Sequence, residues 1–172
     1  MLYTDRLTDH WEVSELCRQS DWPALSNDEA AQVNLRRLAA TALEPLRILW
    51  GGPLIAISGY RSPAHNAEVG GAQASQHMLG KAADVTPADV DWASLRFHFL
   101  GKPGFEEFTE RMARDQERIR KLDLLVEHSL ARELVAVGGV GLYPGWVHVD
   151  IRCRGLHDHV ARWHGGDFGS EQ

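Results

Sequence analysis

The chain has 172 residues, which is enough for one domain with a sizeable hydrophobic core and too short for two domains of typical size. Hydrophobic residues make up 44% and charged residues 24%, a composition typical of folded globular proteins and unlike that of disordered ones. The net charge is −6 without a basic stripe, and no apolar run approaches the roughly 20 residues of a membrane helix, so we expect neither a nucleic-acid nor a membrane partner.

The N-terminal part predicts a short helical turn over residues 11–17, a polar loop up to Pro23, and then a long amphipathic helix. Ser26 and Glu29 have the spacing of a capping box, in which each side chain satisfies the other residue's free backbone N–H, and they predict where this helix begins. Pro45 should kink the helix or divide it in two. The predicted apolar face of the helix is formed by Leu35, Leu38, Ala42, Leu46 and Leu49.

Two strands and a short helix are predicted next. Residues 54–60 indicate a buried strand by their β-branched content and the glycines that bracket them. Ser62 is expected to cap a short helix with Pro63 at its first position, which is the favoured place for proline. The segment 81–85 predicts a second strand, in which alternation places Asp84 on one face and the adjacent valine on the other.

The second half begins with a charged segment, residues 86–136, whose helical spacing predicts an enlarged insertion with a solvated face. We expect this insertion to lie at the rim of a substrate-binding cleft. The stretch 134–152 predicts two strands joined by a glycine-rich turn, with His148 and Asp150 on one face of the second strand. Taken together, these patterns predict one α+β domain over residues 1–163, a small, mainly antiparallel sheet with helices packed around it, and a flexible tail over 164–172.

The two cysteines, Cys17 and Cys153, lie far apart and without metal-type spacing, which predicts two small, partly buried hydrophobic residues. Nothing in the spacing demands a disulfide, although nothing forbids one. The first residues lack the basic segment and apolar core of a signal peptide, so we expect synthesis in the cytoplasm. A target outside the cell would then require release of the protein or another delivery route.

Charged residues stand in two segments that otherwise consist of glycine, alanine and valine: Arg61, His77, Asp84, His148 and Asp150. Small apolar neighbours solvate charge poorly, so such groups are normally paired or bound to a metal. Two imidazoles and one carboxylate suit a catalytic zinc site with an open fourth position. Each residue alone also has an ordinary structural interpretation: a hydrogen-bonded histidine, a capping aspartate, or an arginine in a salt bridge beside a helix.

The segments "SGYRSP", "VGGA", "SQHMLGKAADV" and "GGVGLYPGWVHVDIR" occur in an order that resembles the zinc D-Ala-D-Ala carboxypeptidase family of peptidoglycan peptidases. That family includes D-alanyl-D-alanine dipeptidases and several phage endolysins, and it shares its fold with the hedgehog signalling domain. Its motif S-x-H-x-x-G-x-A-x-D is matched from Ser75 to Asp84, and its later strand histidine by His148. The resemblance covers residues 11–163, least well in the insertion, and implies that one Zn²⁺ is bound by His77, Asp84 and His148.

The resemblance also implies roles for residues beside the metal. Arg61 would stabilise the oxyanion that forms when water attacks the peptide carbonyl, as a permanently charged guanidinium with several donors can. Ser75, Gln76 and Tyr143 are candidates for binding the substrate. Asn66 also matches the family pattern and is expected to be structural.

The general base is the point at which this sequence departs from the family. Many members have an acidic residue three positions before the last zinc ligand, or a histidine shortly before it, where this chain has Gly145 and Trp146. Asp150 shares a strand face with His148 and is our first candidate for the base. It can equally be a carboxylate that orients a zinc-bound imidazole. Further candidates are Tyr143, His157 and His159.

The function predicted from these features is that of a monomeric zinc metallopeptidase that hydrolyses stem or cross-link peptides of peptidoglycan, or muropeptides, by a zinc-activated water. The bonds cut would often involve D-amino acids. The alternative is a non-catalytic zinc-containing binding domain of the same fold, which the gap at Gly145 favours and the presence of Arg61 and all three ligands opposes. A metal-free structural domain would leave Asp84 buried without a partner.

Overall fold

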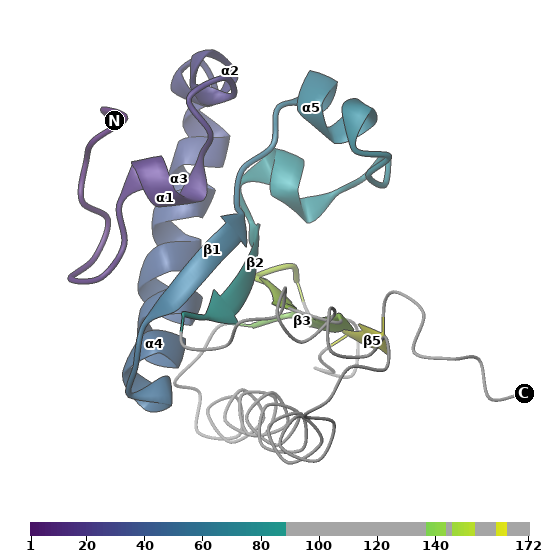
Figure 1. Ribbon diagram of the computed structural model, residues 1–172. Coiled ribbons are helices and arrows are strands. Elements are labelled where there is room, and N and C mark those ends of the chain that lie inside the picture. Colours follow the sequence, from purple (N-terminus) through teal and green to yellow (C-terminus); the bar gives the residue numbers. More distant parts are fainter. Residues whose placement is uncertain (89–136, 144–145, 154–160, 165–172) are drawn as a thin grey trace, which may run out of the picture.

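The computed structural model describes residues 1–88, 137–143, 146–153 and 161–164. Most of the insertion expected at 86–136 and nearly all of the expected tail lie outside these ranges. Helices from the N-terminal part pack along a sheet, and two short helices lie at one end of its first strands (Figure 1). No helix among the described residues is long and apolar enough to cross a membrane.

The helices form in chain order from the N-terminus. Their bounds are α1 Val13–Leu16, α2 Trp22–Ser26, α3 Glu29–Leu38, a π-helical turn Ala39–Leu43, α4 Glu44–Trp50, α5 Pro63–Glu68 and a 3₁₀ helix Gln76–Leu79. The last two follow strand β1, Leu54–Ser58. Ser62 caps α5 as predicted by accepting a hydrogen bond from the backbone N–H of His65.

The start of α3 differs from the prediction. Its cap is Asp28, whose carboxylate accepts from the backbone N–H of Ala31 at 2.9 Å. Ser26 cannot take this part, because residues 22–26 form a helix of their own and its hydroxyl donates to the carbonyl of Pro23 instead. The capping box expected between Ser26 and Glu29 was therefore wrong.

Pro45 divides the long helix, as predicted. It lies in the first turn of α4, directly after the π-helical turn, and the backbone N–H of Glu44 bonds to the carbonyl of Ala39, five residues earlier. A proline has no N–H and its ring presses on the carbonyl four residues before it. The wider π turn accommodates that carbonyl while the chain continues as a helix.

Within the described residues, five strands form one sheet in the order β1-β2-β4-β3-β5. The bounds are β1 Leu54–Ser58, β2 Ala82–Pro87, β3 Gly139–Tyr143, β4 Trp146–Asp150 and β5 Ala161–His164. The first four strands pair antiparallel and β5 pairs parallel to β3, which confirms the predicted, mainly antiparallel α+β fold. Gly139 and Gly141, two glycines of the stretch 134–152, lie within β3.

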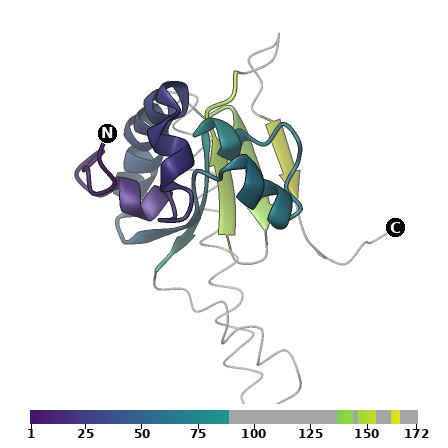
Figure 2. The same cartoon turned by 90° about the horizontal axis from the view of Figure 1, so that it is seen from above.

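The core lies between the N-terminal helices and one face of the sheet (Figures 1 and 2). Strand alternation sends Val85 and Val149 into this core and leaves Asp84 and His148 on the opposite face. Cys17 is buried and Cys153 exposed, and both are free thiols. Burial raises the pKa of the Cys17 thiol to about 12. The largest fully buried side chains are Trp11, Leu16, Leu25, Leu35, Leu38, Leu43 and Leu46.

A buried carboxylate joins the N-terminal helices to α5. Asp21, at the start of α2, is 1% exposed; its Oδ1 accepts from the hydroxyl of Ser62 at 2.5 Å and from its backbone N–H at 3.2 Å. Its Oδ2 lies 2.7 Å from Nδ1 of His65. Since the chain between Arg61 and α5 is anchored here, this cluster fixes the segment that follows the predicted site arginine.

Replacing Asp21 by alanine is expected to lower the free energy of unfolding by about 2–4 kcal/mol, because Ser62 and His65 lose a charged acceptor. Burial alone would raise the pKa of Asp21, but the hydrogen bonds from Ser62 and His65 outweigh burial and leave that pKa below its usual value. The stabilisation is therefore complete above the unfolded pKa of about 4 and is lost as pH falls through the lower native pKa.

Urea denaturation at several pH values measures this effect. The advantage of the wild-type protein over Asp21→Ala should be constant near neutrality and shrink below about pH 4. Asp9→Asn, at an exposed position, is the control and should change stability by less than about 0.5 kcal/mol. An Asp21→Ala protein as stable as this control would contradict the prediction.

Candidate metal centre

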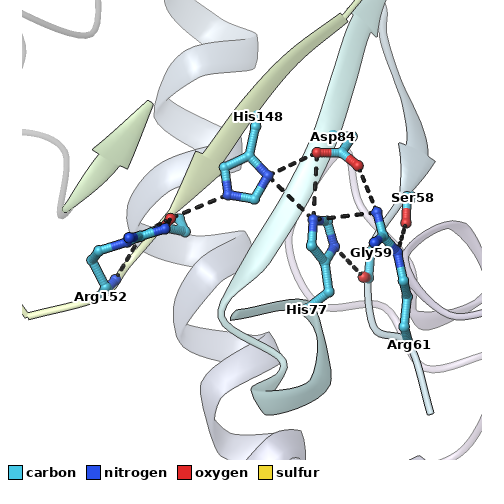
Figure 3. A network of polar contacts seen from close by, with 8 residues as sticks. Ser58, Gly59, Arg61, His77, Asp84, His148 and Arg152 are labelled. Atoms are coloured by element: carbon cyan, nitrogen blue, oxygen red, sulfur yellow. Dashed lines mark hydrogen bonds and ion pairs between the residues drawn. The ribbon is translucent and has the colours of Figure 1, made fainter. Parts of the chain in front are cut away.

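Three buried side chains meet on the face of the sheet opposite to the core. Asp84 on β2 and His148 on β4 are directly paired across the two strands, and His77 comes from the 3₁₀ helix that precedes β2. Their residues are 7%, 7% and 4% exposed, and one potential ligand atom from each lies within 4.8 Å of the other two. Figure 3 shows the three side chains pointing toward one another.

The spacing of these atoms suits a tetrahedral metal ion. His77 Nε2 lies 3.2 Å from His148 Nδ1 and 3.4 Å from Asp84 Oδ1, and Asp84 Oδ1 lies 2.8 Å from His148 Nδ1. Nitrogen and oxygen ligands at the usual distance of about 2.05 Å from zinc would lie about 3.3 Å apart. Two separations match this value and the third is that of a hydrogen bond, so His77, Asp84 and His148 can bind a metal ion.

The far side of each imidazole faces a hydrogen-bond acceptor. Nδ1 of His77 lies 2.7 Å from the backbone carbonyl of Gly59, and Nε2 of His148 lies 3.1 Å from Oδ2 of Asp150. A carbonyl or an ionised carboxylate can only accept, so these two contacts favour a proton on Nδ1 of His77 and on Nε2 of His148. In the neutral rings the lone pairs of His77 Nε2 and His148 Nδ1 then point to the same place, as metal ligation requires.

The electrostatics favour an ionised Asp84. Burial alone would raise the pKa of this carboxyl, but hydrogen bonds and charges from His148 and His77 outweigh burial and hold the pKa well below its usual range. Burial lowers the pKa of His148, and its hydrogen bonds to Asp150 and Asp84 outweigh that effect and raise the pKa. A metal ion needs an unprotonated nitrogen, so at His148 it would compete with the proton that the two carboxylates favour.

Arg61 completes the cluster from the segment after β1. Its Nη2 donates to Asp84 Oδ2 at 2.9 Å and lies 3.5 Å from His77 Nε2, while its Nε donates to the hydroxyl of Ser58 at 2.8 Å (Figure 3). The two oxygens of Asp84 thus have different partners: Oδ1 faces the imidazoles and Oδ2 faces the guanidinium. The contact with Ser58 went unrecognised in the sequence, although Ser58 pairs with Asp84 across β1 and β2.

Asp150 does not lie among the three possible ligands. It is completely buried behind His148, where Arg152 also binds its carboxylate. This position suits a carboxylate that orients the imidazole, the second of the two roles considered for it. Arg152 was not recognised in the sequence, although it follows Asp150 at the two-residue spacing of one strand face.

The remaining candidates lie around this cluster or outside the described residues. Ser75 and Gln76 are half-buried and belong to the cap and first position of the 3₁₀ helix that carries His77. Tyr143, at the end of β3, stacks on Trp146 with ring centroids 5.0 Å apart. Gly145, His157 and His159 lie outside the described residues.

Comparison with known protein families gives one match. A family model described as Peptidase M15 matches residues 9–115, more than half of the chain. The matched range contains Arg61, His77 and Asp84, and His148 lies beyond it. A search of curated proteins found no match.

Proposed function

Because the chain belongs to the peptidase M15 family of metal-dependent hydrolases, we propose that it is a zinc peptidase that cleaves stem or cross-link peptides of peptidoglycan. The observation that carries this proposal is the buried set of His77, Asp84 and His148, whose facing atoms are 2.8–3.4 Å apart. Peptide hydrolysis follows from the family. The choice of peptidoglycan, and of bonds that involve D-amino acids, follows from the sequence motifs that resemble wall-degrading members.

In this proposal the bound zinc would lower the pKa of a water molecule and polarise the scissile carbonyl. His77, Asp84 and His148 would hold it, and Arg61 would donate to the oxygen on which negative charge develops. Asp150 lies behind His148, so it would act by orienting that imidazole rather than by taking a proton from the water. Ser75 and Gln76 stand beside His77 and would bind the substrate backbone.

The second candidate function is a non-catalytic zinc-binding domain of the same fold. It is favoured by Gly145, which stands three positions before His148 where many family members have an acidic residue. A domain of this kind would bind zinc and a wall peptide without cutting it. Hydrolysis that depends on the metal separates the two functions.

We expect the zinc-loaded protein to release new fragments from muropeptides of at least one wall type, as detected by mass spectrometry. The fragments should disappear with a chelator, return when zinc is added back, and be absent with His77→Ala, which removes one ligand. His10→Ala is the matched control, since His10 is a half-exposed histidine that bonds to Glu44 outside the cluster. One bound zinc per chain without cleavage of any substrate would favour the binding domain.

A further inference from the structure

Both ring nitrogens of His148 have a specific neighbour: Nδ1 faces His77, and Nε2, on the other side of the ring, faces Asp150. A neutral imidazole has one N–H and one lone pair, so Nδ1 can bind a metal only while Nε2 keeps the proton. Asp150 Oδ2 lies 3.1 Å from Nε2 and is the acceptor that favours this tautomer. Asp84 Oδ1 lies 2.8 Å from the other nitrogen, so the hold of Asp150 on the Nε2 proton is what favours an Nδ1 available to a metal.

Arg152 holds this carboxylate from the opposite side. Its Nε lies 2.8 Å from both oxygens of Asp150, its Nη2 lies 2.5 Å from Oδ2, and its backbone N–H donates to Oδ1 at 3.0 Å. Asp150 is completely buried, whereas the side chain of Arg152 is 36% exposed. The guanidinium thus balances the buried charge, and its planar fork also restricts how the carboxylate can turn.

The neighbouring strand leaves room for this pair. A Cβ atom added to Gly139 would lie 2.5 Å from Asp150 Oδ2 and 2.9 Å from Arg152 Nε, and one added to Gly138 would lie 1.9 Å from the carbonyl oxygen of Arg152. Gly139 is also the residue of β3 that pairs with Asp150. Glycine is needed here because any side chain would displace the carboxylate or the guanidinium that binds it.

We propose that Arg152 is a positioning residue of the metal centre: it clamps Asp150 so that Oδ2 keeps the proton of His148 on Nε2 and leaves Nδ1 to bind the metal. This inference rests on the metal site of the proposed function and goes beyond it, because it assigns a role to a residue outside the set of possible ligands. A structural role alone, in which Arg152 only neutralises Asp150, would not depend on the shape of the fork.

The test compares Arg152→Gln and Arg152→Lys with the unchanged protein by competition for zinc with a chromogenic chelator. We expect Arg152→Gln to weaken zinc binding on the order of 10- to 100-fold, as for other residues that support a ligand from behind. Arg152→Lys keeps the charge without the fork and should recover only part of the loss. Arg6→Gln, which breaks an exposed ion pair with Glu12, is the control and should bind zinc unchanged.

A second measurement needs no substitution and so does not depend on whether a variant folds. In the cadmium-loaded, ¹⁵N-labelled protein, coupling between the metal and nitrogen should identify Nδ1 of His148 as the ligand, with a proton on Nε2 in slow exchange with water. Ligation through Nε2 would overturn the proposal, as would zinc affinity in Arg152→Gln within twofold of the unchanged protein, or full recovery in Arg152→Lys. Correct ligation without cleavage of any muropeptide would instead contradict only the proposed function.

Discussion

Replacing Asp84 by asparagine is expected to lower kcat/KM for peptide hydrolysis on the order of a thousandfold or more and to remove zinc from the purified protein. Asparagine has nearly the same shape, so the change isolates the negative charge. Asp84 Oδ1 lies 2.8 Å from His148 Nδ1 and 3.4 Å from His77 Nε2, and it is the one anionic member of the ligand set. A neutral amide would leave two imidazoles to hold a dication.

The charge also matters to the residues that surround Asp84. Its Oδ2 accepts from Arg61 at 2.9 Å, and the two side chains are mostly buried, at 17% and 10% exposed. Without the carboxylate, Arg61 would be a buried cation without its partner. We therefore expect Asp84→Asn to lose some stability as well as the metal, and the folded fraction must be checked by circular dichroism before activities are compared.

Metal analysis and kinetics on the same preparations decide this prediction. Asp9→Asn removes a carboxylate at an exposed position and should retain both zinc and activity. If Asp84→Asn kept one zinc per chain and more than a tenth of the activity, Asp84 would not be a ligand. A metal ligand other than Asp84 would then have to join His77 and His148.

Local patterns and the resemblance to a known motif together pointed to the three possible ligands, because all three lie in or beside short, regular elements. Alternation along β2 and β4 sends Asp84 and His148 to one face, and the antiparallel register then places them opposite each other. His77 is held by a 3₁₀ helix that ends at Gly80, whose φ of 66° is a conformation that favours glycine. The resemblance to a known motif supplied the order in which these elements occur.

The contacts behind the ligands could not be predicted, because they depend on tertiary structure. Ser58 meets Arg61 only through the register of β1 and β2, and Arg152 meets Asp150 in the space that Gly139 leaves on the next strand. The prediction of where α3 begins failed for a related reason. Ser26 and Asp28 both suit a helix cap, and the short helix α2 uses the serine, which leaves the aspartate to cap.

Arg61→Lys is expected to lower kcat on the order of a hundredfold while the zinc content stays at one per chain. The guanidinium donates through Nη2 to Asp84 and through Nε to Ser58, and Nη1 makes no hydrogen bond with any of the described residues. Those two bonds fix the plane of the group beside the ligands. We expect Nη1 to donate to the oxygen that becomes charged in the transition state, and a lysine ammonium cannot keep both anchors and reach that oxygen.

A purely structural salt bridge between Arg61 and Asp84 predicts a different result. Lysine would keep the positive charge that pairs with Asp84, and the variant would therefore keep most of the activity. The transition-state role and the structural role of Arg61 can be distinguished by the affinity for an inhibitor as well as by the rate. If Arg61 acts in the transition state, affinity for a phosphinate analogue of the cleaved peptide should fall in Arg61→Lys in proportion to kcat/KM, while KM changes little. Arg36→Lys, on the exposed side of α3, should change neither quantity. Equal losses of zinc and activity in Arg61→Lys would instead assign Arg61 to holding Asp84 in place.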